Sequence, residues 1–110
     1  MKEVYIKDLR KDSEVIDFFM VKATAIKTGS NGKQYWDLTL GDKYGEVTAK
    51  KWDITDREIE SILTIKEKDI VKVKALITEW AGQLQMRVMR IRPANENDEI
   101  DMQDYVKAAP

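Results

Sequence analysis

The sequence predicts an all-β fold, a small barrel of five strands with one short helix between the third and fourth strands. Three observations lead to this prediction. The chain has 110 residues, enough for one domain and too few for two. Apolar and polar residues alternate along five segments, as in strands with one buried face. After the third segment the apolar spacing changes to that of a helix.

The first predicted strand is a long β-rich segment that runs from Val15 to Thr28. Its alternation predicts that Lys22 and Thr24 face outward, opposite Val21 and Ala23. The stretch "TGSNGKQ" follows as a loop, because it is rich in Gly, Ser and Asn.

The second and third predicted strands decide which aromatic residues face solvent. In "YWDLTL" the alternation places Trp36 in the core and Tyr35 on the outer face. In "GEVTAKKWD" it places Lys50 and Trp52 together on the outer face, an unusual position for the largest apolar side chain. Lys51 falls on the inner face. Either its stem reaches the barrel rim, or the strand parity slips there and turns Trp52 inward.

A short helix is predicted from about Asp56 to Leu63, because apolar residues recur there at helical spacing. Thr55 with Glu58 three residues later forms a capping box, and Ile54 with Ile59 forms the hydrophobic staple around it.

Strand alternation returns in "DIVKVKALITEW" and, after the turn "AG", in "QLQMRVMRI" up to Pro93. Five strands with a helix between the third and fourth have the order of the OB-fold, a five-stranded Greek-key barrel. An SH3-like barrel and a generic five-stranded sheet are the rival interpretations. Neither accounts as well for a capped helix at that point.

The composition argues against several classes of function. The chain has no cysteine and no histidine, which rules out disulfides, imidazole bases and histidine-built metal sites. Asp53 and Asp56 flank a helix start, where acids usually act as caps, and "GSNG" lacks the rest of a phosphate-binding loop. We therefore expect no catalysis and no cofactor in this chain. No segment resembles a membrane span or a signal peptide, so we expect a cytoplasmic protein without membrane contact.

Charge is unevenly distributed along the chain, whose net charge is −1. Residues 95–110 hold five of the 20 acidic side chains and one of the 19 basic ones, so the remainder is mildly basic. This balance permits nucleic-acid binding without demanding it. We divide the chain into an N-terminal leader (1–14), an OB-fold domain (15–94) and an acidic tail or interdomain linker (95–110). Apart from Ile100, Met102, Tyr105 and Val106, the tail lacks apolar periodicity, and we expect it to be mobile or to pack on a partner.

Aromatic residues interleaved with cations make the outer face of the barrel a candidate nucleic-acid groove. OB barrels bind single strands across strands two and three, between the loops that join strands one to two and four to five. Bases stack on aromatic rings, and lysine or arginine side chains follow the phosphates. The positions expected to converge on this groove are Lys22, Lys33, Tyr35, Lys50, Trp52, Trp80, Gln85 and Arg87.

Purely structural interpretations of the same residues, without any binding role, stay open. Outward lysines are most often just solvated, Tyr35 could be an ordinary cross-strand packing residue, and a bulge beside Lys50 would bury Trp52. A different class of function is an interaction module, in which the outward apolar residues Phe18 and Met20 mediate oligomerisation.

The ordered motifs resemble a known family. "NGKQYWDLTLGDKYGEVTAKKWD" is similar to OB segments of replication protein A and of bacterial tRNA- and DNA-binding domains. In the replication protein A domains, the aromatic residue at the position of Trp52 stacks on single-stranded DNA. The closer resemblance is to the N-terminal OB domain of the YhaM-type 3′-to-5′ exoribonucleases, the CMP-binding-factor family. "YIKDL", "FFMVK", "DIVKVKA" and "LQMRVMRIRPA" have counterparts there in order, and "DYVKAAP" resembles the connector to the catalytic domain.

This resemblance implies a single-stranded nucleic-acid-binding module that prefers RNA and guides it to an HD-type catalytic domain C-terminal to this chain. The divalent metal would belong to that domain, because its histidine ligands are absent here. The implied partners are single-stranded RNA or DNA and the catalytic domain, and homo-oligomerisation stays open. Lys51 departs from the family pattern, which usually has an apolar inward residue at that position.

Overall fold

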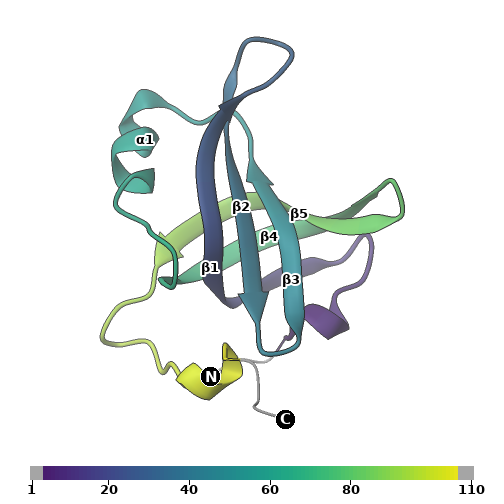
Figure 1. The fold of residues 1–110 in the computed structure, drawn as a ribbon, viewed down its shortest axis with the longest axis vertical. Coiled ribbons are helices and arrows are strands. Elements are labelled where there is room, and N and C mark those ends of the chain that lie inside the picture. Colours follow the sequence, from purple (N-terminus) through teal and green to yellow (C-terminus); the bar gives the residue numbers. More distant parts are fainter. Residues whose placement is uncertain (1–3, 107–110) are drawn as a thin grey trace.

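The computed structural model describes residues 4–106, and their helices and strands follow the predicted order (Figure 1). None of these helices is long and apolar enough to cross a membrane. Two single-turn helices, η1 and η2, flank the barrel. The elements are η1 (Ile6–Asp8), β1 (Glu14–Thr28), β2 (Gln34–Asp42), β3 (Gly45–Lys51), α1 (Asp56–Ile62), β4 (Ile70–Trp80), β5 (Gln83–Pro93) and η2 (Met102–Asp104).

The five strands close into a barrel in the order β1-β2-β3-β5-β4. The strand β4 returns to pair with β1, and β3 pairs with β5 in parallel, whereas the other neighbours are antiparallel. This arrangement, with α1 between β3 and β4, is the predicted OB-fold.

The long strand β1 belongs to both halves of the barrel. Residues 14–20 pair with β4, and residues 20–28 pair with β2. A β-bulge between Val21 and Ala23 marks the change of partner. Such a bulge bends the strand and lets one strand serve two sheets.

The bulge also reverses the alternation of β1, so the predicted orientation of two residues is wrong. Ala23 is exposed, whereas Thr24 is half-buried and its Oγ1 accepts a hydrogen bond from Nε1 of Trp36 at 2.7 Å. Trp36 is only 1% exposed, so this bond satisfies an indole N–H inside the core.

The main core is filled by the inward residues of all five strands, and α1 contributes Ile62 to it. The predicted cap of α1 is confirmed. Thr55 Oγ1 accepts a hydrogen bond from the backbone N–H of Glu58 at 3.2 Å, which satisfies one donor of the first helical turn.

The segment before β1 is attached to the barrel by backbone donors and two buried carboxylates. The Val4 N–H donates to Asp17 Oδ2 at 2.6 Å, and the Ile6 N–H donates to Asp42 Oδ2 at 2.7 Å. Leu9 is buried in the main core. Buried carboxylates need such donors, and the short chain before β1 supplies them.

The segment after β5 folds back onto the same barrel. Tyr105 is 1% exposed and forms a second apolar cluster with Phe18 and Met20. The alternation correctly placed Phe18 and Met20 outside the main core. They do not form an exposed oligomerisation surface, however, because Tyr105 packs with them in this cluster.

The segments before and after the barrel meet at one end of the molecule (Figure 1). Tyr5 Oη donates to Asp104 Oδ1 at 2.8 Å, and this hydrogen bond raises the pKa of Tyr5 to about 12. We expected the tail to be mobile or to pack on a partner. Up to residue 106 it packs on its own barrel, and residues 107–110 lie outside the described part of the chain.

Replacing Tyr105 with Ala is expected to lower the free energy of unfolding by about 3–5 kcal/mol, as for other buried aromatic residues. Urea denaturation measures this. Met102→Ala is the control, because Met102 is 49% exposed in the same segment and should change stability by less than about 0.5 kcal/mol. Equal midpoints for the two variants would contradict the packing of Tyr105.

The ion pair between Arg92 and Asp98 predicts a pH dependence. Arg92 lowers the pKa of Asp98 from 3.8 to about 2, with help from the backbone N–H of Asn95. The stabilising contribution is complete above the ordinary pKa and is lost as the pH falls through about 2. We expect Asp98→Asn to flatten the fall in melting temperature below pH ~4. Parallel curves for the variant and the parent chain would contradict this contribution.

Candidate nucleic-acid interface

The orientation of Trp52 depends on Lys51, and the structure retains the strand parity there. Val47 and Ala49 are buried, and Lys51 continues their inner face. Its side chain is 18% exposed, and its Nζ lies 2.6 Å from Glu58 Oε2 on α1. Lys51 therefore extends its stem to the rim, the first of the two predicted alternatives. Trp52, the next residue, is 41% exposed.

Trp52 forms an aromatic pair with Tyr35, which lies on the outer face of β2. The ring centroids are 4.3 Å apart and the rings are tilted by 31°. Lys50 Nζ lies 5.6 Å from the Tyr35 centroid and 6.0 Å from that of Trp52, within the range of a cation–π interaction. Gly29 in the β1–β2 loop lies against the indole, since a Cβ there would be 3.5 Å from Cζ3. The indole is thus held in position and remains partly accessible.

A hollow of about 300 Å³ lies beside this pair, across β3, β4 and β5. In the parallel pairing of β3 with β5, Lys50 is opposite Arg87, which brings two cations to the same place. We call this feature the Trp52 hollow, and its lining residues are Lys50, Trp52, Thr78, Trp80, Gln85, Met86 and Arg87.

Trp80 forms the outer margin of the Trp52 hollow and is 71% exposed. It ends β4, pairs with Gln83 and is followed by a two-residue turn. Ala81 and Gly82 in this turn have φ values of 53° and 80°, the left-handed conformation that type I′ hairpin turns require. The tight hairpin, which projects from the barrel in Figure 1, fixes where Trp80 is presented.

Two acidic residues near the groove, Asp37 and Asp53, are paired with lysines. Lys27 Nζ lies 2.7 Å from Asp37 Oδ2 on the outer face of β2, and this contact raises the pKa of Lys27. Lys33 in the β1–β2 loop lies 3.9 Å from Asp53, and both side chains are largely exposed. An exposed pair of this kind contributes little to stability, so Lys33 can exchange its partner at low cost. Within residues 4–106 no cluster of acidic side chains could hold a metal ion.

The structure brings most of the predicted groove residues together. Lys33 lies at the margin, paired with the residue that follows Trp52. The residues at the Trp52 hollow or stacked beside it are Tyr35, Lys50, Trp52, Trp80, Gln85 and Arg87.

Lys22 is the exception among the predicted residues. It lies over Gly41, where an added Cβ would be 3.0 Å from Cε of the lysine. Gly41 is near the opposite end of β2 from Tyr35, about 20 Å away at the usual rise per residue of a strand. The structure therefore separates Lys22 from the Trp52 hollow.

Three residues of this surface were not predicted from the sequence, and one of them, Met86, is a core residue that reaches the floor of the hollow. Thr78 lines the hollow, and its alternation with the inward Ile77 could have revealed it. Lys27 lies outward and pairs with Asp37, but only because the bulge in β1 reversed the parity. Strict alternation from Val21 would turn Lys27 inward, so the sequence indicates a change of parity without showing where it occurs.

The sequence matches no model of a known protein family. Its fold is similar to that of solved OB domains. The second OB-fold domain of replication protein A from Methanococcus maripaludis is 18% identical with a TM-score of 0.61, over 92% of this chain and 100% of that domain. A chain of a replication protein A heterotrimer bound to ssDNA is 12% identical with a TM-score of 0.56, over 76% of this chain.

A putative aspartyl-tRNA synthetase from Leishmania major Friedlin gives 17% identity and a TM-score of 0.57, over 90% of this chain. This chain spans 58% of the matched replication protein A chain and 19% of the synthetase. At such identities the likeness shows the fold alone, and that fold is the OB-fold.

Proposed function

We propose that this chain is a single-stranded nucleic-acid-binding module that holds its ligand at the Trp52 hollow. The observation that carries this proposal is the accessible Tyr35–Trp52 pair with Lys50 and Arg87 beside it. An aromatic face binds any base by stacking, and neighbouring cations neutralise the phosphates. The fold likeness to a protein bound to ssDNA supports the same interpretation.

The proposed binding mode assigns one task to each side chain. A base stacks on Trp52, and a neighbouring base stacks on Trp80 across the hollow. Lys50 and Arg87, which are opposite each other in the β3–β5 pairing, contact the phosphate between them. Gln85 presents an amide that can both donate and accept hydrogen bonds at a base edge.

We propose RNA as the preferred strand, and delivery to an HD-type exoribonuclease domain C-terminal to this chain as its role. The ordered motifs that resemble the exoribonuclease family support this assignment. The metal and the bond cleavage would belong to that other domain. Titration with RNA and DNA oligonucleotides of one sequence tests the preference, and tighter DNA binding would contradict it.

Replacing Trp52 with Ala tests base stacking. We expect single-strand affinity to fall by about 1–3 kcal/mol, because one stacking platform is removed. Stability should fall by only about 1 kcal/mol, the contribution of the pair with Tyr35. Trp36→Ala is the matched control, and because Trp36 is buried it should cost about 3–5 kcal/mol of stability. Fluorescence anisotropy and urea denaturation measure the two quantities. If Trp52→Ala unfolds as readily as Trp36→Ala and still binds, stacking on Trp52 is wrong.

Replacing Lys50 with Ala tests the phosphate contact. Affinity should fall for every sequence, and the slope of log affinity against log salt should become shallower by about 0.7, the value for one contact on a single strand. Lys66→Ala is the control, since Lys66 is exposed in the α1–β4 loop. An unchanged salt slope in Lys50→Ala would exclude the contact.

A further inference from the structure

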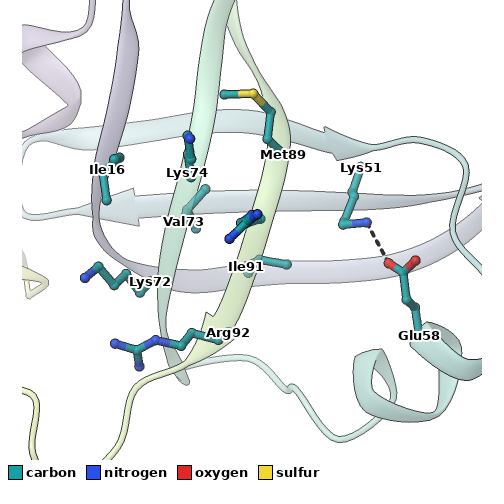
Figure 2. Close-up of a pocket in the computed structure, with 10 residues that line it drawn as sticks. Ile16, Lys51, Glu58, Lys72, Val73, Lys74, Met89, Ile91 and Arg92 are labelled. Carbon is teal, nitrogen blue, oxygen red and sulfur yellow. Dashed lines mark hydrogen bonds and ion pairs between the residues drawn. The ribbon is translucent and has the colours of Figure 1, made fainter.

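A second cluster of cations lies on the outer face of β4 and β5. These cations line a hollow of about 610 Å³ that extends to the Lys51–Glu58 pair at the barrel rim (Figure 2). This hollow shares no lining residue with the Trp52 hollow. Ile16 and Met89 add apolar surface at its margin and are 56% and 41% exposed. We define the basic face by its four cations, which are Lys72, Lys74, Arg90 and Arg92.

A bulge in β5 creates this face. Ala75 is opposite Val88 and Lys74 is opposite Arg90, so Met89 is an extra residue without a partner on β4. Before the bulge Arg87 faces outward, and regular alternation would then turn Arg90 inward. The extra residue resets the parity, and the arginines on both sides of it are exposed.

The basic face places like charges directly opposite each other. Lys72 is opposite Arg92, and Lys74 is opposite Arg90. Two such adjacent pairs disfavour the sheet unless anions offset them. Figure 2 shows the side chains of Lys72 and Arg92 extending in the same direction from neighbouring strands.

The described carboxylates offset only part of this charge. Arg92 pairs with Asp98 at 2.8 Å, and Lys74 lies 3.8 Å from Glu14. No carboxylate within residues 4–106 forms an ion pair with Lys72 or Arg90. Lys72 Nζ lies 5.6 Å from the centroid of the Phe18 ring, and its charge helps to lower the pKa of Asp98. Neither interaction is a direct ion pair, so Lys72 and Arg90 can each contact an external anion.

We propose that the basic face binds the phosphate backbone of a single strand whose bases occupy the Trp52 hollow. The inference rests on the proposed function and extends the bound strand along β5. Arg87 at the hollow and Arg90 on the basic face are about 10 Å apart along one strand. A backbone that leaves Arg87 therefore reaches Arg90 and then Lys72.

The contact between Arg92 and Asp98 supports a phosphate as the ligand. Nη1 and Nη2 lie 2.8 Å and 3.1 Å from the two carboxylate oxygens. A guanidinium binds two phosphate oxygens with the same fork geometry. Asp98 thus occupies an anion position that is already formed, and the strand would compete with it for Arg92.

Oligonucleotides of two lengths test the inference, one of about four nucleotides and one of about sixteen, the range of site sizes on OB domains. The double variant Lys72→Ala/Arg90→Ala should bind the short oligonucleotide as the parent chain does. Its affinity for the long one should fall, with a salt slope shallower by about 1.4 for two lost contacts. Trp52→Ala should weaken both lengths, and Lys66→Ala should weaken neither.

The outcomes separate the two proposals. If the double variant binds both lengths normally while Trp52→Ala weakens both, the basic face is not a strand contact and the proposed function stands. If neither variant changes binding, both proposals fail. Loss of binding to phosphatidylserine vesicles with unchanged oligonucleotide binding would identify a lipid surface and overturn the inference.

Asp98→Asn provides a test in the opposite direction. The amide keeps an oxygen for the Asn95 N–H but removes the charge that holds Arg92. We expect several-fold tighter binding of the long oligonucleotide at low salt and unchanged binding of the short one. Equal affinity of the variant and the parent chain for the long oligonucleotide would show that Arg92 contacts no phosphate.

Discussion

The barrel depends on the bend of β1 at its bulge. One strand must pair with β4 over its first half and with β2 over its second, because otherwise the sheet stays open. The bulge that permits this change of partner also turns Thr24 toward Trp36. With its indole N–H satisfied, Trp36 can be buried at no polar cost. This anchors β2 in the register that leaves Tyr35 outside.

The candidate site depends in turn on the end of β3. Burying the charge of Lys51 on the inner face costs free energy of folding, and the ion pair with Glu58 offsets this cost. The same carboxylate takes part in the cap of α1, where Glu58 Oε1 accepts a hydrogen bond from Thr55 Oγ1 at 3.3 Å. One carboxylate therefore links the start of the helix to the parity of the strand that presents Trp52. The helix supports the groove without contacting it.

The regular part of the fold and most of the candidate site could be predicted, because both follow from the alternation of inward and outward residues along each strand. That alternation placed Trp36 inside, and Tyr35 and Trp52 outside. The positions of the bulges in β1 and β5 could not be predicted. Strict alternation would turn Lys27 and Arg90 inward, which shows that the parity changes in each strand but not at which residue. The bulges account for the wrong orientation of Thr24 and for the unnoticed basic face. The role of Tyr105 was hidden for another reason. The outward Phe18 and Met20 required a cover, but no local pattern shows which distant segment supplies it.

The parallel pairing of β3 with β5 consists of three residue pairs, from Thr48–Gln85 to Lys50–Arg87. This ladder is the shortest of the five in the barrel, so we expect local opening to begin between β3 and β5. The Trp52 hollow lies across this ladder, with one cation on each side. A polyanion bridging Lys50 and Arg87 would tie the two strands together and slow their amide hydrogen exchange. A ligand in the Trp52 hollow would then reduce local opening between β3 and β5 and make the barrel more rigid.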